Sequence, residues 1–260
     1  MQKDRDSALL LEMERLALEA GAKAMAIYAG PIEVAAKGDA SPVTEADRLG
    51  EEIILSGLAR AAPGIPVLAE EAASGGAIPE LGDEFFLVDP LDGTKEFITR
   101  TGEFTVNIAL VRDGAPALGV VYAPAMSKLY LGVKGRGAWM RRTGAGEDAR
   151  PIHARRAPAA GLVAVASRSH RGPETDAFLS TLTITDFAAA GSSLKFCLIA
   201  EGLADVYPRL GRTMEWDTGA GQAVLEAAGG RVVEFDSGRV LRYGKKARGF
   251  DNPHFIAWGA

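Results

Sequence analysis

Two aspartates at the end of an apolar stretch are the residues of this sequence best suited to chemistry. Residues 85–96 read FFLVDPLDGTKE, in which four apolar residues lead into Asp89 and Asp92, three positions apart. Two carboxylates within about 4 Å repel by roughly 1 kcal/mol in water and by several times that at protein-like dielectric. One of them would normally take up a proton, because a like charge nearby raises a carboxyl pKa. A divalent cation removes this conflict.

Magnesium would suit the oxygen atoms around this pair. Mg²⁺ prefers octahedral oxygen coordination and keeps water molecules that a substrate phosphate can replace. Asp89, Asp92, the main-chain carbonyl of Leu91 and the side chain of Glu70 could supply oxygens without histidine or cysteine. The three histidines of the chain show no metal-ligand spacing, and we expect them at the surface or in packing contacts.

Each acidic residue also has a plain structural interpretation. Asp47 and Asp217 stand at expected helix starts, where an acidic residue most often caps the helix. The pair Glu70 and Glu71 could belong to a solvated face, and residues 89–93 could form an ordinary turn. The interpretation as a site therefore requires that the fold bring these acids together.

Two helices and a run of strands are predicted for the first half of the chain. Apolar residues at helical spacing predict a helix over 6–29, and a second helix is expected from Thr44, its cap, to about Ala61. A short strand over 66–69 delivers Glu70. Beyond Phe85, an antiparallel meander is expected, with strands over 105–111, 117–122, 129–133 and 138–140.

Strands and helices alternate after Leu162, which predicts a second, layered α/β lobe. The expected helices cover 173–182, 192–201 (capped by Ser192) and 217–228, and the expected strands cover 162–166, 184–187, 205–207, 231–235 and 255–258. Residues 143–160 are expected to form a loop or linker. We therefore predict an N-terminal α+β lobe over 1–150 that carries most of the cation ligands, and a C-terminal α/β lobe over 151–260 that completes one compact catalytic unit.

Composition restricts the classes of function. A net charge of −5 over 260 residues argues against binding of nucleic-acid polymers, whose phosphates reward clustered lysine and arginine. The single cysteine, Cys197, excludes an internal disulfide and is expected in the core. Charged residues interrupt the apolar stretch near the N-terminus before it could span a membrane, and we find no secretory signal. A cytoplasmic protein is expected.

Motifs in several parts of the chain resemble the Mg²⁺-dependent, lithium-inhibited inositol monophosphatase superfamily. They are VTEAD at 43–47, AEE at 69–71, DPLDGTKEF at 89–97 and WDTGAGQAVLEAAGG at 216–230. A narrower resemblance to the CysQ-type 3′(2′),5′-bisphosphate nucleotidases depends on KEF at 95–97, GEFTVNIALV at 102–111, GVVYAP at 119–124, SRSH at 167–170, GSSLKFC at 191–197 and YPR at 207–209. One departure is Gly219, where the family usually has alanine; a glycine inside a helix costs up to about 1 kcal/mol.

The resemblance implies a fold and a set of site residues. The fold would be a layered αβαβα sandwich with the site between two lobes. Two or three Mg²⁺ ions would be held by Glu70, Asp89, the Leu91 carbonyl, Asp92 and Asp217. Asp47 together with Thr94 would orient the attacking water and help to deprotonate it.

Substrate contacts are implied in the same way. The substrate phosphate would meet Glu70, Leu91, Asp92 and Asp217 through the ions, and the main-chain N–H groups at Gly93 and Thr94 directly; glycine there allows close approach of an anion. Ser192 and Ser193 are candidates for the sugar or the second phosphate, with a bare N-cap as the alternative role for one of them. Lys195 and Arg209 are candidates for the remaining phosphate charge.

The implied reaction is hydrolysis of 3′-phosphoadenosine 5′-phosphate to AMP and phosphate, with its sulfated analogue as a further substrate, in sulfur assimilation and nucleotide recycling. One alternative is the same chemistry on inositol phosphate, fructose 1,6-bisphosphate or NADP. The sequence Lys95-Glu96-Phe97 favours the nucleotide, because inositol-phosphate enzymes more often have Thr-Asn-Phe there. A second alternative is a non-catalytic module that binds nucleotide or metal, which the complete set of acids disfavours.

The expected state is a monomer or homodimer with no integral membrane segment, either free in the cytoplasm or peripheral at the inner face of the membrane.

Overall fold

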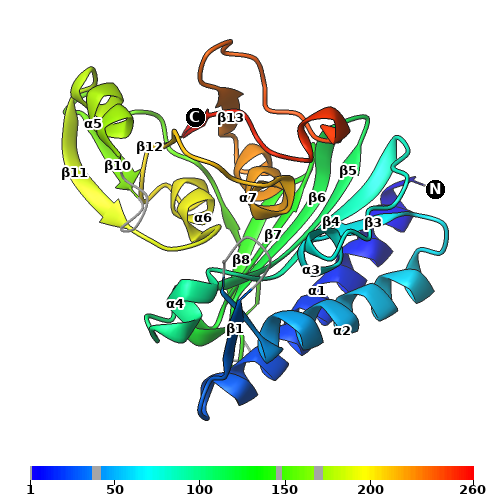
Figure 1. Cartoon of the computed structure of the whole chain (residues 1–260). Helices are drawn as coiled ribbons and strands as arrows, with labels where there is room; N and C mark the ends of the chain where they lie inside the picture. Colours follow the sequence, from blue (N-terminus) through cyan, green and yellow to red (C-terminus); the bar gives the residue numbers. More distant parts are fainter. Residues whose placement is uncertain (1, 37–41, 145–147, 167–171) are drawn as a thin grey trace.

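Helices and sheets alternate in layers through the molecule. The computed structural model describes residues 2–36, 42–144, 148–166 and 172–260, and Figure 1 shows the order of the layers in this part of the chain. From one side to the other they are helices α1 (Gln2–Tyr28) and α2 (Glu45–Ala61), a first sheet, helices α6 (Leu194–Ala200) and α7 (Glu215–Ala227), a second sheet and helix α5 (Pro173–Ser180). This arrangement confirms the predicted αβαβα sandwich.

The first sheet contains the predicted meander. Among the described residues it has seven strands in the order β3 (Val67–Ala69), β4 (Glu84–Asp92), β5 (Thr105–Arg112), β6 (Ala115–Ala123), β7 (Lys128–Val133), β8 (Gly137–Arg142) and β9 (Arg150–Ile152). Strand β3 runs parallel to β4, and all the other neighbours are antiparallel. The prediction of a loop or linker over 143–160 is wrong for β9. This strand forms because Ile152 pairs with Ala138 on β8 and is buried there. Such a pairing between distant parts of the chain cannot be recognised from the sequence of three residues.

Strand β4 is buried on both faces, which explains its continuous apolar run. Phe86 and Val88 belong to the core between the sheet and helices α1 and α2. Phe85 and Leu87 alternate with them and belong to the core on the side of α6 and α7. The strand that ends in the two aspartates is therefore held firmly on both sides.

The second sheet and its helices come from the C-terminal half of the chain. In the described residues its strand order is β11 (Ile184–Ala189), β10 (Leu162–Ala166), β12 (Val206–Arg209), β14 (Phe255–Trp258) and β13 (Arg231–Glu234). Strand β10 is parallel to both of its neighbours, and the remaining pairs are antiparallel. The prediction that Ser192 caps helix α6 is wrong. The helix begins at Leu194, and neither its N-cap residue Ser193 nor Ser192 caps it, because both hydroxyls are directed to other partners described below.

Helix α7 lies directly against the first sheet, although its neighbours in sequence, β12 and β13, belong to the second sheet (Figure 1). A Cβ atom on Gly119 of β6 would lie 2.6 Å from the Ala220 carbonyl oxygen, and one on Gly132 of β7 would lie 2.6 Å from the Val224 Cα atom. The departure at Gly219 has a packing reason, since a Cβ there would lie 2.8 Å from the Leu87 side chain. Glycines on both sides of this contact let the helix and the sheet approach closely.

The remaining elements are short. They are β1 (Val34–Ala36), β2 (Pro42–Thr44), α3 (Glu70–Ser74), α4 (Thr94–Ile98), η1 (Pro124–Met126) and η2 (Lys246–Arg248). The SRSH motif at 167–170 lies outside the described residues. Cys197 is fully buried, as predicted. No helix in the described ranges is long and apolar enough to cross a membrane. The division into lobes over 1–150 and 151–260 stays a prediction.

Candidate active site

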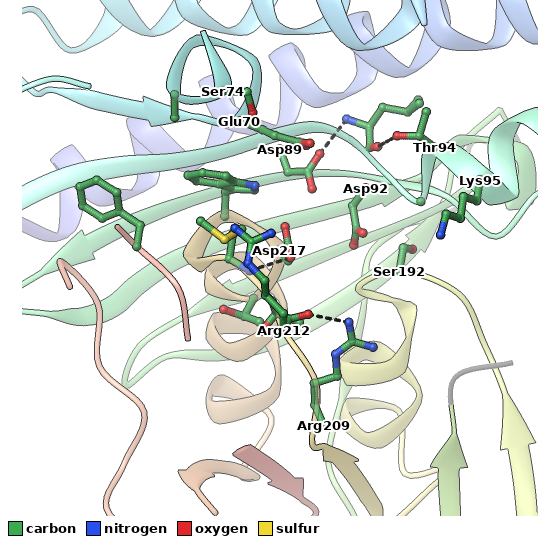
Figure 2. A pocket seen from close by; sticks show the side chains of 18 of the residues that line it. Glu70, Ser74, Asp89, Asp92, Thr94, Lys95, Ser192, Arg209, Arg212 and Asp217 are labelled. Carbon is green, nitrogen blue, oxygen red and sulfur yellow. Dashed lines mark hydrogen bonds between the residues drawn. The ribbon is translucent and has the colours of Figure 1, made fainter. Parts of the chain in front are cut away.

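A cavity of about 640 Å³ opens where α3, α4 and the end of β4 meet α6, β12 and α7. Figure 2 shows Glu70 of α3, Asp89 and Asp92 of β4 and Asp217 of α7 around this space. Apart from Asp47, every residue predicted for the site lines this cavity: Glu70, Asp89, Leu91, Asp92, Gly93, Thr94, Ser192, Lys195, Arg209 and Asp217. The fold therefore brings together acids that are separated by up to 147 positions in sequence.

An irregularity in β4 directs both aspartates into the cavity. Residues three apart on a regular strand point to opposite faces of the sheet. Here Asp89 pairs with Asn107 and Asp92 pairs with Thr105, so three steps along β4 match two steps along β5. The extra residue forms a bulge at Pro90-Leu91, which restores a common direction for the two carboxylates. Bulges of this kind are common beside active sites.

Two further carboxylates reach the same cavity from helix starts. Glu70 is the first residue of α3, directly after β3. Asp217 lies in the first turn of α7, where its Oδ2 accepts a hydrogen bond from the Met214 main-chain nitrogen at 2.8 Å. The expected capping role of Asp217 is therefore real, and it does not prevent the side chain from lining the cavity.

The grouped carboxylates carry more negative charge than the surrounding protein offsets. Burial, followed by the charges of Glu70, Asp92 and Asp217, raises the pKa of Asp89 well above its usual range. Burial first, and then Asp92 and Glu70, raises the pKa of Asp217 to about 8. Burial also raises the pKa of Asp92, although Lys195, Ser193 and Asn107 act in the opposite direction. The cavity is thus a place where an added cation would be strongly favoured.

The donor chemistry of these residues fits a hard divalent cation. All the candidate ligands are carboxylate or carbonyl oxygens, and the buried histidine and cysteine ligands typical of zinc are not needed. Within the described ranges, no three His, Cys, Asp or Glu side chains are already grouped tightly enough to hold a metal ion. The carboxylates line one cavity without forming a closed metal site, and their roles as ligands stay a prediction.

Thr94 and Asp47 form a hydrogen-bonded pair at the start of α4. Thr94 Oγ1 donates to Asp47 Oδ1 at 3.1 Å and lies 3.4 Å from the Leu91 carbonyl oxygen. Asp47 is fully buried, and its other oxygen accepts from the main-chain nitrogen and the hydroxyl of Thr44 at 2.8 and 2.7 Å. Asp47 therefore caps α2, as its plain interpretation predicted, and holds the Thr94 hydroxyl in place at the same time.

Gly93 makes the turn before α4 possible. Its φ angle is 95°, in the left-handed region, and a Cβ atom would lie 3.2 Å from the Glu103 carbonyl oxygen. The short helix that follows begins at Thr94.

Positive side chains line the side of the cavity opposite Glu70 and Asp89. Figure 2 shows Arg209 and Arg212 across from these acids, with Asp217 between the two groups. Arg209 donates to the Arg212 carbonyl oxygen at 2.8 Å, and its Nε is buried without a hydrogen-bond partner in the described part of the chain. Lys195 is buried, and this burial lowers its pKa to about 8. Arg209 and Lys195 could therefore bind an anionic group of a ligand.

Two polar residues hold Asp92: Asn107, which sequence reasoning missed, and Ser193, which was expected to contact substrate or to be a bare N-cap. Asn107 Nδ2 donates to Asp92 Oδ2 at 3.2 Å and to Ser193 Oγ at 2.9 Å. Ser193 Oγ lies 3.1 Å from the same carboxylate oxygen, whereas Ser192 Oγ accepts from Thr105 Oγ1 at 3.1 Å. A lone asparagine inside the apolar stretch GEFTVNIALV was a usable signal for Asn107. No comparable feature of the sequence indicates that Ser193, and not Ser192, contacts Asp92.

The comparisons with known proteins agree with this geometry. The sequence profile of the Inositol monophosphatase family matches residues 6–253. The 3′(2′),5′-bisphosphate nucleotidase CysQ of Shigella flexneri is 45% identical over 254 residues, which cover 95% of this chain and 98% of that protein. The crystal structure of CysQ from Bacteroides thetaiotaomicron, described as a bacterial member of the inositol monophosphatase family, superposes with a TM-score of 0.81 at 39% identity, over 96% of each chain.

An inositol monophosphatase from Anabaena (Nostoc) is a more distant structural relative. Its TM-score is 0.73 at 27% identity, and the match covers 97% of this chain and 90% of that one. The profile match and the identity over nearly the whole length lead to one conclusion. This chain belongs to the inositol monophosphatase family.

Proposed function

We propose that this chain is a metal-dependent phosphatase, a 3′(2′),5′-bisphosphate nucleotidase, that hydrolyses 3′-phosphoadenosine 5′-phosphate to AMP and phosphate. The observation that carries the proposal is the convergence of Glu70, Asp89, Asp92 and Asp217 on one cavity that also contains Lys195 and Arg209. The similarity to proteins named CysQ over almost the full length supports the nucleotide as substrate. The sulfated analogue of the nucleotide carries the same 3′-phosphate and is a further substrate.

Mg²⁺ is the proposed cofactor, as two or three ions. Glu70, Asp89, Asp92, Asp217 and the Leu91 carbonyl would hold it, since all of them offer oxygen atoms to the same cavity. When bound, Mg²⁺ supplies charge neutralisation at the scissile phosphate and at the leaving oxygen, and it makes a water molecule more acidic. Asn107 and Ser193 would keep Asp92 directed toward the cavity through their hydrogen bonds to Oδ2.

Thr94 and Asp47 are the proposed catalytic residues. The Thr94 hydroxyl donates its proton to Asp47 and therefore presents its lone pairs to the cavity, where they can accept a hydrogen bond from the attacking water. Asp47 is the buried base toward which that proton moves through Thr94. The water attacks phosphorus, and the bond to the 3′-oxygen breaks. That oxygen leaves with the bonding electron pair and takes a proton from solvent to become the 3′-hydroxyl of AMP.

The remaining polar groups of the cavity are proposed to bind the rest of the nucleotide. Lys195 and Arg209 would hold the second phosphate, because both line the cavity and a cation forms charge-assisted hydrogen bonds with phosphate. Ser192 also lines the cavity, and its hydroxyl, which accepts from Thr105, can donate to the ribose. The N–H groups at Gly93 and Thr94 would approach the scissile phosphate. A cytoplasmic location and a monomeric or homodimeric state are retained as proposals.

Phosphate release from a panel of substrates tests the function. Purified protein with Mg²⁺ is expected to release phosphate from 3′-phosphoadenosine 5′-phosphate far faster than from inositol 1-phosphate, and a chelator is expected to stop the reaction. Millimolar or lower Li⁺ is expected to inhibit it. Equal or reversed rates for the two substrates would defeat the assignment. Tight nucleotide binding without any turnover would instead support a non-catalytic binding module.

A further inference from the structure

Glu51 is a buried acidic side chain close to the cavity that has no part in the site described so far. It is 6% exposed and lies on α2, one helical turn after Asp47. Residues four apart on a helix share a face, so both carboxylates project from the same side of α2. Asp47 uses this position to hold Thr94. Glu51 instead contacts α3, the short helix that begins with Glu70.

Both carboxylate oxygens of Glu51 bind the first turn of α3. Oε2 accepts from the Glu71 main-chain nitrogen and Oε1 accepts from the Ala72 main-chain nitrogen, each at 2.8 Å. The first N–H groups of a helix have no partner within the helix. The N-cap residue of α3 is Ala69, whose methyl side chain makes no capping bond. Glu51 therefore caps α3 from another helix, and its negative charge is favourable at that end.

The position of α3 determines the position of Glu70, its first residue. Helix α3 has five residues, none of which is fully buried, and its half-buried Ala73 packs against the core. Glu70 lines the cavity together with Asp89 and lies within hydrogen-bonding reach of it. The two hydrogen bonds to Glu51 hold the first turn of α3, and with it Glu70, in this place.

Helix α2 is a suitable anchor because it also contacts the strand that carries Asp89. A Cβ atom on Gly50, next to Glu51, would lie 3.2 Å from the Pro90 side chain. The same helix therefore touches the bulge of β4 at Gly50 and the start of α3 at Glu51. We propose that Glu51 is a positioning residue that holds Glu70 beside Asp89 for cation binding, an inference that rests on the proposed metal-dependent function.

Titration with Mn²⁺ alone tests this role without the reaction. Mn²⁺ takes oxygen ligands as Mg²⁺ does, and free Mn²⁺ is measured directly by its electron paramagnetic resonance signal. Glu51→Gln keeps the shape of the side chain but offers a single, uncharged acceptor oxygen to the two main-chain N–H groups, so one hydrogen bond is weakened and the other is lost. Its Mn²⁺ dissociation constant is expected to rise about 10-fold, the lower range for residues that orient metal ligands. Amide exchange at Glu71 and Ala72 is expected to become faster.

Two variants separate positioning from other effects. Glu52→Gln is the matched control, since Glu52 is adjacent on α2 and its side chain is 67% exposed, paired only loosely with Arg48 at 3.5 Å. This control is expected to bind Mn²⁺ like the wild-type protein. Glu51→Asp keeps the charge but is too short to reach both N–H groups, and the same loss of affinity is expected for it.

Three results would overturn the inference. They are a Glu51→Gln protein that is less stable but binds Mn²⁺ normally, a Glu51→Asp protein with wild-type affinity, and a Glu52→Gln protein as impaired as Glu51→Gln. Circular dichroism establishes that each variant is folded. A wild-type protein that neither binds Mn²⁺ nor releases phosphate would refute the proposed function itself, which is a distinguishable result.

Discussion

Asp89 combines full burial with three acidic neighbours, and a single atom change tests its role. Asparagine has nearly the same shape, and its oxygen can still accept the hydrogen bond that Asp89 takes from the Leu91 nitrogen at 3.0 Å. Asp89→Asn is expected to lower phosphate release by about a hundredfold or more, since a charge that acts on the transition state is lost. The stability without metal is expected to stay equal or to rise, because the variant removes repulsion from Glu70, Asp92 and Asp217. Phosphate assays and thermal unfolding measure the two effects, and near-normal turnover would contradict the ligand role.

Thr94 is expected to act through its hydroxyl group alone. Thr94→Val keeps the branched shape and removes the donor to Asp47. We expect kcat to fall by about 10²-fold, in the range of general acid–base contributions, while the Mg²⁺ requirement changes little. Thr94→Ser keeps the hydroxyl and is expected to retain most of the activity. Thr99→Val is the control, since the exposed hydroxyl of Thr99 donates to the Lys95 carbonyl oxygen, within α4 and its C-terminal end. Equal losses in Thr94→Val and Thr99→Val would exclude the catalytic role.

At the scale of elements, the approach of α7 to the first sheet sets the position of Asp217. A Cβ on Gly132 would meet main-chain atoms of Ala223 and Val224 at 2.6–2.7 Å, and main-chain atoms cannot turn aside as a side chain can. Gly132→Ala is expected to destabilise the fold by about 1–3 kcal/mol, a loss of several degrees in Tm, and to raise the Mg²⁺ concentration needed for half-maximal activity.

Gly82→Ala is the matched control for this prediction. A Cβ at position 82 meets no atom within 4 Å, and the residue does not have a positive φ. Its Tm and Mg²⁺ requirement are expected to match those of the wild-type protein. A Gly132→Ala protein with unchanged Tm would show that helix and sheet have room to separate.

Local patterns predicted most of the elements but not their irregularities. Helical periodicity and the Thr44 cap identified α2, and alternation with turn residues identified the meander. The short strand β9 and the start of α6 were predicted wrongly, because pairing with β8 and the contacts of two serine hydroxyls decide them. The predicted acids do line one cavity, but the bulge that turns Asp89 and Asp92 to the same side depends on the register with β5, which no spacing in β4 reveals.

At the scale of the whole molecule, the buried acids couple stability, pH and metal. The pKa of Asp217 rises from its ordinary value of 3.8 to about 8 in the folded protein, and those of Asp89 and Asp92 rise as well. Between about pH 4 and pH 8 the metal-free folded protein thus holds more protons than the unfolded chain, and its stability falls as the pH rises. The pKa values of Asp6 and Glu84 are lowered in the folded protein, from ordinary values of 3.8 and 4.5. These two groups make stability rise with pH, but only at pH values up to about their ordinary pKa values, at or below the lower end of this range.

Cations bind to the deprotonated acids, so the affinity for cations rises with pH, whereas the stability of the metal-free protein falls. In thermal unfolding scans, the Tm of the metal-free protein is expected to decrease from about pH 5.5 to about pH 8. The increase in Tm caused by Mg²⁺ is expected to grow over the same range. A metal-free Tm that rises with pH, or an Mg²⁺ effect that shrinks, would contradict the coupling.

The central claim is that four acids from separate elements bind divalent cations in one cavity. The most direct measurement is anomalous diffraction from crystals of the protein grown with Mn²⁺. We predict peaks about 2.0–2.3 Å from carboxylate oxygens of Glu70, Asp89, Asp92 and Asp217, the distances of a hard cation with oxygen ligands. A well-ordered cavity without such a peak, or Mn²⁺ bound only elsewhere on the molecule, would contradict the claim.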